Sequence, residues 1–210
     1  MNGTELARAH GVETSPFRVI RAANLRALAN EWVRLRPFRM LPSHLLTLTM
    51  LLLAGFPRER VAIVGGFYAL NSTHLIIHAR RARRTGIHER TLFHSHLLLL
   101  TLQSCVVAAT GAMHSPLWPA LLGASLGTLN LFGRSRESWI TVSYTSALAV
   151  ILALLPASIA GPPIAEPWHT ALGCWTILFT LFLLRTSTFG FSDAYRATEE
   201  QLDRLREEVI

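Results

Sequence analysis

The chain has 210 residues, of which 50% are hydrophobic and only 16% are charged, whereas an average soluble domain carries about 25% charged residues. The charges are also segregated, because five long stretches contain none: Met40–Pro57, Val61–Ala79, Thr91–Phe132, Ser138–Ala165 and Pro167–Leu184. These features exclude an ordinary soluble domain, and the two cysteines, both within apolar stretches, exclude a secreted disulfide scaffold. The sequence therefore predicts an all-α, multi-pass membrane protein.

Residues 1–37 are predicted to form a cytoplasmic segment that contains one amphipathic helix. Ser15-Pro16 is typical of a helix start, with Ser15 as the capping residue. Apolar residues then recur at helical spacing among several arginines: Phe17, Ile20, Leu25, Leu28, Trp32 and Leu35. This pattern favours a helix that lies on the inner membrane surface, near anionic lipid.

Residues 38–184 are predicted to form a six-helix transmembrane domain, since a spanning helix needs about 20 mostly apolar residues. The six candidates are Phe38–Phe56, Val61–Ala79, Leu92–Thr110, Leu117–Phe132, Trp139–Ile159 and Trp168–Leu184. Short connectors join them, which predicts three helical hairpins. In the fourth candidate, Gly123 and Gly127 form a step of small residues that predicts close approach of another helix.

The arginines predict the orientation of these spans, because basic residues are retained on the cytoplasmic side. With the N-terminus inside, every arginine except Arg58 and Arg60 falls on the cytoplasmic side. We therefore expect both termini in the cytoplasm and a location in the bacterial inner membrane. This topology also accounts for the net charge of +7, and since no nucleic-acid recognition motif accompanies it, we expect no nucleic-acid partner.

Residues 185–210 are predicted to form a cytoplasmic signalling helix. Phe191, Tyr195, Thr198, Leu202, Leu205 and Val209 follow one another at spacings of 4, 3, 4, 3 and 4 residues. This heptad pattern predicts a parallel two-stranded coiled coil that continues the sixth span of a homodimer. A lone amphipathic tail helix is the alternative. The predicted dimer seam consists of Tyr195, Thr198, Leu202, Leu205 and Val209.

Polar residues within the predicted spans are candidate functional residues, because such residues are costly in a membrane. They gather in the cytoplasmic half of the bundle: His44, Tyr68, Asn71, His74, His78, His94 and His96. One interpretation is a metal or haem site formed by His74, His78, His94 and His96. The other is hydrogen bonding across helices. The HxxxH step is similar to that of membrane di-iron hydroxylases, but their further histidine boxes and any carboxylate within a span are lacking here.

The connector Thr110–Leu117 resembles the GGxxNPF loop of RegB-type redox-sensing histidine kinases, which have six membrane helices. Gly111 and Pro116 match, whereas Ala112, Ser115 and Leu117 differ from that pattern. The resemblance implies a quinone or another lipid-like ligand. The implied ligand contacts are Gly111, His114, Ser115, Pro116 and Trp118. A tight turn without a ligand is the alternative, and the layout is also similar to the six-helix anchors of membrane adenylate cyclases.

Together these features predict a sensor or receptor input module in signal transduction. It would pass a ligand or redox signal through the sixth span and a dimeric coil to a cytoplasmic effector domain, either a histidine kinase of a two-component system or a nucleotide cyclase. Two rival classes stay open: a histidine-ligated metal or haem oxidoreductase, and a small transporter or structural anchor. The sequence itself contains no recognisable catalytic constellation.

Overall fold

The computed structural model describes residues 16–86, 88–132, 135–156 and 158–209. Within these residues all of the regular secondary structure is helical, which confirms the all-α prediction. The elements are α2 (Pro16–Leu53), α3 (Arg58–Thr85), α4 (Glu89–Ala109), the short 3₁₀ helix η1 (Ala112–His114), α5 (Trp118–Phe132), α6 (Arg136–Ala153) and α7 (Trp168–Val209).

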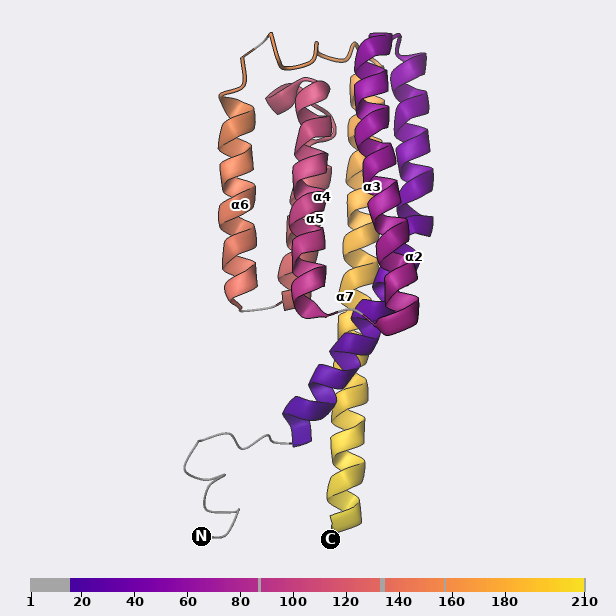
Figure 1. Cartoon of the computed structure of the whole chain (residues 1–210), viewed down its shortest axis with the longest axis vertical. Helices are drawn as coiled ribbons and strands as arrows, with labels where there is room; N and C mark the ends of the chain where they lie inside the picture. Colours follow the sequence, from indigo (N-terminus) through magenta and orange to yellow (C-terminus); the bar gives the residue numbers. More distant parts are fainter. Residues whose placement is uncertain (1–15, 87, 133–134, 157, 210) are drawn as a thin grey trace.

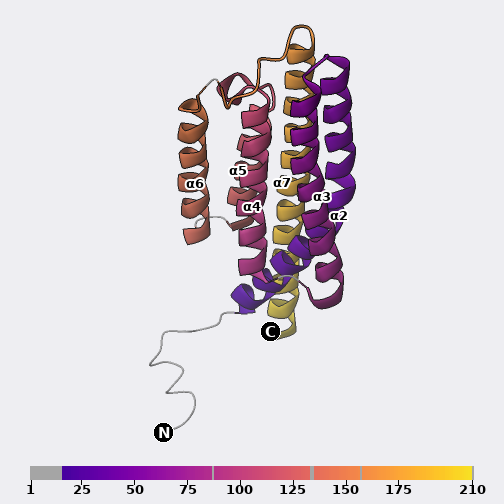
Figure 2. The same cartoon turned by 45° about the horizontal axis from the view of Figure 1, so that its top comes forward.

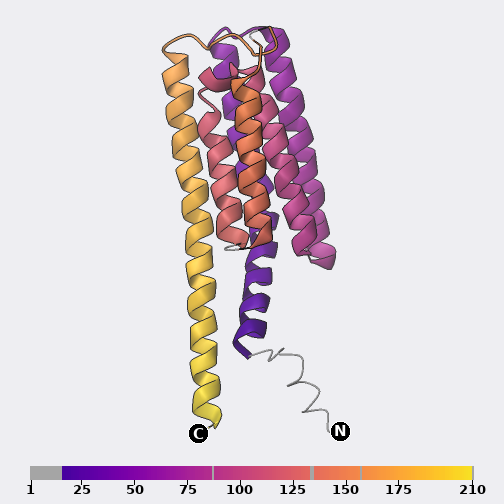
Figure 3. The same ribbon diagram turned by 90° about the vertical axis from the view of Figure 1, so that its left-hand side faces the viewer.

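The long helices stand side by side in one bundle (Figure 1). Helix α7 packs along α2 on one side and along α5 on the other, and α4 packs against α3 and α5. The beginning of α2 and the end of α7 lie at the same end of the bundle (Figures 1 and 3). We refer to this end as the lower end, and to the opposite end, which holds the connectors α2–α3, α4–α5 and α6–α7, as the upper end.

The prediction of three helical hairpins is wrong for the last pair. Helix α6 stands at the edge of the bundle against α4 and α5, whereas α7 packs against α2 and α5. The segment between α6 and α7 passes over the upper end to bridge that separation (Figure 2). Two hydroxyl pairs hold α6 in place: Thr101 with Tyr144 at 2.6 Å, and Ser125 with Thr145 at 2.8 Å.

Helix α6 also ends earlier than predicted. The sequence suggested a span to Ile159, but the helix ends at Ala153, with Leu154 as its C-cap. Pro156 explains this difference, because proline disfavours helical backbone at the residue before it. The described part of the following connector is irregular and exposes Leu154 and Ile159.

Among the residues that the structure describes, three segments are long and apolar enough to cross a membrane: Arg58–Thr85, Arg90–Ala109 and Trp168–Thr186. Many large apolar side chains point outward from the bundle. Phe38, Leu45, Trp139 and Leu178, for example, each expose more than 60% of their surface. Such an exterior is costly in water and is what a lipid environment stabilises.

Helices α2 and α7 both extend below the bundle. Helix α2 is continuous through Pro37 and Pro42, so no break separates the predicted amphipathic segment from the first predicted span. Its first part leaves the bundle at an angle (Figure 1), as helices commonly do near proline. Helix α7 has 42 residues and is therefore about 63 Å long, roughly twice the thickness of a hydrocarbon core of about 30 Å.

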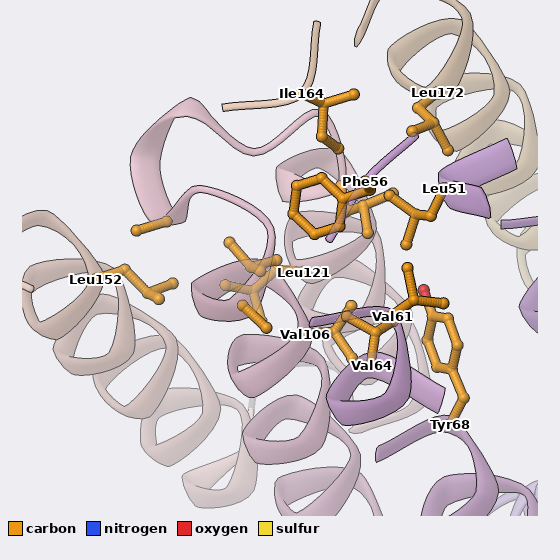
Figure 4. Packing of buried hydrophobic residues seen from close by; sticks show 14 of the residues in the cluster. Leu51, Phe56, Val61, Val64, Tyr68, Val106, Leu121, Leu152, Ile164 and Leu172 are labelled. Atoms are coloured by element: carbon orange, nitrogen blue, oxygen red, sulfur yellow. The ribbon is translucent and has the colours of Figure 1, made fainter. Parts of the chain in front are cut away.

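The apolar core is concentrated toward the upper end of the bundle (Figure 4). It joins side chains from every long helix and from the α6–α7 connector: Leu51, Val64, Val106, Leu121, Leu152, Ile164 and Leu172 are among its buried members. A second, smaller cluster at the lower end consists of Val33, Ala82 and Leu92. Packing at both ends therefore fixes the helices relative to one another.

Polar contacts stabilise the upper connectors. Arg60 Nη1 donates to the carbonyl of Ile159 at 3.0 Å, and the amide of Gly161 donates to the carbonyl of Ala108 at 3.0 Å. At the start of α7, Glu166 accepts hydrogen bonds from the hydroxyl and the amide of Thr170, at 2.8 and 3.3 Å. The hydrogen bond from the Thr170 hydroxyl is the main cause that lowers the pKa of Glu166 from its usual value.

Candidate functional site

The connector between α4 and α5 forms a tight turn. Gly111 has a φ of 115° and Ala112 a φ of 51°, so both residues adopt backbone conformations that favour glycine. The hydroxyls of Thr110 and Ser115 are hydrogen bonded at 2.6 Å, and the amide of Leu117 donates to Ser115 Oγ at 3.2 Å. The hydroxyl of Ser115 is therefore used within the turn itself.

The residues proposed as ligand contacts differ in their accessibility. Gly111, Ser115 and Pro116 are buried, Trp118 is half-buried and His114 is exposed. The carbonyl of His114 accepts a hydrogen bond from Nε2 of His169 at 3.2 Å, which links this turn to α7. The turn geometry predicted from Gly111 and Pro116 is thus present, and the ligand contact stays a prediction.

Replacing Ala112 with glycine is expected to stabilise the protein. An L-residue in the left-handed region costs about 1–2 kcal/mol relative to glycine. Loss of the buried methyl group of Ala112 offsets part of this gain, so Ala112→Gly should raise the free energy of unfolding by about 1 kcal/mol. The melting temperature should rise by about 2–4 °C, measured by circular dichroism in detergent. Met113→Gly is the matched control and should lower stability, since glycine there only adds freedom to the unfolded chain. A lower melting temperature for Ala112→Gly would contradict this interpretation.

Three of the predicted polar residues form a network between α2 and α3. The imidazole of His44 stacks on the ring of Tyr68, with 4.2 Å between ring centroids. Nε2 of His44 lies 3.4 Å from Nδ2 of Asn71, and Nδ1 lies 3.1 Å from the hydroxyl of Ser72. Because an amide nitrogen can only donate, the contact with Asn71 corresponds to the tautomer in which Nε2 of His44 accepts and Nδ1 donates to Ser72.

The four histidines proposed as metal ligands do not form a common cluster. The rings of His74 and His78 lie 4.4 Å apart, and Nε2 of His74 is hydrogen bonded to the hydroxyl of Ser95 at 2.8 Å. His94 is exposed, whereas His96 is buried, as expected for residues two positions apart on a helix. Nδ1 of His94 bonds to the carbonyl of Arg90, and that of His96 to the carbonyl of Leu92.

In the described part of the chain, no three His, Cys, Asp or Glu side chains come together in an arrangement that could hold a metal ion. The hydrogen bonds of His44 and His74 instead connect α2 with α3 and α3 with α4. This matches the interpretation of hydrogen bonding across helices. The metal or haem interpretation stays a prediction, which elemental analysis of the purified protein would test.

A cavity lies within the bundle, among α2, α3, α4, α5 and α7. It has a volume of about 90 Å³. Its lining includes four of the candidate polar residues, His44, Tyr68, Asn71 and His96, and also Arg36 and Gln103. The lining residues of α2 follow a helical period, since Arg36, Met40, Ser43 and Thr47 are separated by 4, 3 and 4 positions.

Arg36 is the functional candidate that sequence reasoning missed. It was counted among the arginines that set orientation, but only 5% of its surface is exposed. The signal that could have revealed it is its helical spacing to Met40, Ser43 and Thr47, which places a charged residue on the same face as polar residues of the first predicted span.

The predicted dimer seam lies outside the described side chains, although its backbone forms part of α7. Comparison of the chain with protein-family models, curated proteins and solved structures gave no match.

Proposed function

We propose that this chain is a membrane sensor or receptor input module. Six spans with both termini in the cytoplasm would hold it in a bacterial inner membrane. A homodimer would pass a ligand or redox signal through α7 to a cytoplasmic effector, either a histidine kinase or a nucleotide cyclase. The distribution of arginines supports the orientation, and the outward-facing apolar residues support lipid as the surrounding solvent.

One observation carries this proposal: the helix that lines the central cavity continues without interruption out of the bundle. Trp175, Phe179 and Leu183 of α7 line the cavity, and the same helix extends to Val209. A rotation or shift of α7 within the bundle would therefore move its cytoplasmic end directly. Helix shifts of this kind are an established means of transmitting a signal.

A shift of α7 would change its contacts with two helices of the bundle. Helix α7 contacts α2 and α5, and the long connector Leu154–Pro167 separates it from α6. A ligand changes the position of such a helix only if it binds two positions with different affinities. The upper turn supports the resemblance to redox-sensing kinases, because Gly111 and Ala112, where that loop pattern has two glycines, both have positive φ.

Insertions into α7 test this proposal, because they rotate the cytoplasmic part of the helix relative to the part within the bundle. We would fuse residues 1–210 to the catalytic domain of a nucleotide cyclase that is active only as a dimer. Two residues inserted between Arg185 and Thr186 rotate the helix beyond them by about 200° and should change cyclase output by about fivefold or more. A seven-residue insertion nearly restores the phase and should keep the output within about twofold of the parent.

The double variant Leu202→Asn/Leu205→Asn provides the monomeric reference and should abolish output. Arg204→Asn is its control, because Arg204 is exposed. Equal output from both insertions and from the parent would instead favour a transporter or a structural anchor, in which α7 transmits nothing.

A further inference from the structure

The residues that line the central cavity extend along the helices, and we refer to the cavity as the central channel. Its lining extends from Leu117, just before α5, to Gly127 on α5, and along α7 from Trp175 to Leu184, which corresponds to about 15 Å at 1.5 Å per residue. A volume of about 90 Å³ far exceeds the roughly 10–15 Å³ that one water molecule requires. Spread over that length, it admits a single alkyl chain.

The lining combines an apolar wall with a few polar groups, as in sites for small amphiphiles. Leu99, Leu117, Trp175, Phe179 and Leu183 contribute apolar surface. Since α2 and α4 rise from the lower end while α3 descends toward it, the polar residues Arg36, His96, His44 and Asn71 occupy the middle and lower part of the channel. A ligand would therefore place its polar group there and its apolar chain along α5 and α7.

Asn71 identifies the chemistry of that polar group. Its side-chain nitrogen faces His44, and its oxygen, Oδ1, is buried with no hydrogen-bond partner among the described residues. Asn71 exposes only 5% of its surface and lines the cavity. A buried acceptor left unsatisfied is destabilising by about 1–3 kcal/mol, so a ligand that donates a hydrogen bond here would gain affinity.

A hydroxyl group meets this requirement better than a carboxylate. An ionised carboxylate only accepts hydrogen bonds and would face the Asn71 oxygen with like partial charge. Arg36, a cation of the same lining, interacts within the protein. A hydroxyl can donate to Asn71 and also accept a hydrogen bond from another group of the lining.

We propose that the central channel is a binding site for a neutral, single-chain amphiphile whose hydroxyl group donates a hydrogen bond to Oδ1 of Asn71. The site differs from the upper turn that the sequence indicated. This proposal concerns ligand binding alone and does not require that α7 transmits a signal. The binding measurements below and the insertions into α7 therefore test separate proposals.

Gly127 allows the channel to be filled without disturbing the packing. It lines the cavity, and a Cβ added there would meet no atom within 4 Å. Gly127→Leu should therefore occupy the channel. Gly66→Leu is the matched control, because a Cβ at Gly66 also meets nothing within 4 Å but this residue is exposed on α3. Both replacements remove a helical glycine and should stabilise the helix similarly.

The measurement is the melting temperature of the full chain in phosphatidylcholine nanodiscs at pH 8, with decan-1-ol, decane or decanoate added. Decan-1-ol near ten times its dissociation constant should raise the melting temperature of the wild type and of Gly66→Leu by about 3–5 °C. In Gly127→Leu the shift should fall below about 1 °C. Comparison of the two glycine variants removes any effect that decan-1-ol exerts through the bilayer.

A second variant tests the polar contact without filling the channel. Asn71→Leu preserves the approximate volume and removes the acceptor, so decan-1-ol should stabilise it no more than decane does. The proposal is overturned if decane stabilises the wild type as strongly as decan-1-ol, or if decanoate does so, because the hydroxyl would then be irrelevant. It is also overturned if no compound distinguishes the wild type from Gly127→Leu, in which case water fills the channel.

Discussion

Replacing Gly161 with alanine should lower the free energy of unfolding by about 3 kcal/mol, the upper range for overpacking in a fixed environment. Gly161 is buried where the α6–α7 connector crosses the end of α4. A Cβ at this position would overlap the carbonyl oxygen of Ala109 and would also lie 2.6 Å from its carbonyl carbon. Both atoms belong to the backbone, so no side-chain rotation can relieve the overlap.

Thermal unfolding in detergent, followed by circular dichroism, would measure this effect. A loss of about 3 kcal/mol corresponds to a fall of roughly 6–12 °C in melting temperature for a chain of this size. Gly66→Ala is the control and should leave the protein unchanged or slightly more stable, since nothing lies within 4 Å of its added Cβ. A melting temperature for Gly161→Ala within 1 °C of the wild type would contradict the close approach of the connector to α4.

Replacing Gly123 with alanine should cost about 2 kcal/mol. The added Cβ would overlap Cγ2 of Thr180 on α7 and lie 3.3 Å from both Cβ and Oγ1 of the same side chain. Threonine is branched at Cβ and has few alternative rotamers in a helix, so α5 and α7 would have to move apart. The close approach of these two helices therefore depends on the absence of a side chain at position 123.

A double-mutant cycle isolates this contact. Thr180→Ala removes the overlapping methyl group, so Gly123→Ala/Thr180→Ala should recover at least half of the lost stability, a coupling of about 1 kcal/mol. Gly127→Ala, four residues further along α5, is the matched control and should stabilise the protein by about 0.5–1 kcal/mol. If Thr180→Ala gave no recovery, the two residues would not be in contact.

At Gly123 and Gly127 the sequence pattern predicts only part of the packing. The spacing of two small residues predicted close packing at both, yet only Gly123 meets a neighbouring helix, whereas Gly127 borders the central cavity. On one helix the two residues share a face, which the sequence reveals. The course of α7 past that face depends on contacts between segments that are distant in the chain.

For the histidines, too, the sequence predicts the position on each helix but not the contacts between helices. Helical spacing and the alternation of helix direction predict that the histidines of α2, α3 and α4 gather in one half of the bundle. The hydrogen bonds of His44 to α3 and of His74 to α4 agree with this prediction. The exposure of His94 beside the buried His96 also follows from the helical period. The helical period does not predict the hydrogen-bond partner of each histidine, because that partner depends on side-chain geometry between helices.

The sequence by itself determined that the chain is all-helical and apolar enough for a membrane, because long charge-free stretches and helical spacing act locally. It also determined the turn at Gly111, since glycine and proline restrict the backbone at their own positions. Only the tertiary structure decided that α7 packs against α2 and α5, that Arg36 is buried, and that five helices line a central cavity. These features arise from the packing of segments distant in sequence, where the fit of whole helix surfaces, rather than any local pattern, selects the neighbours.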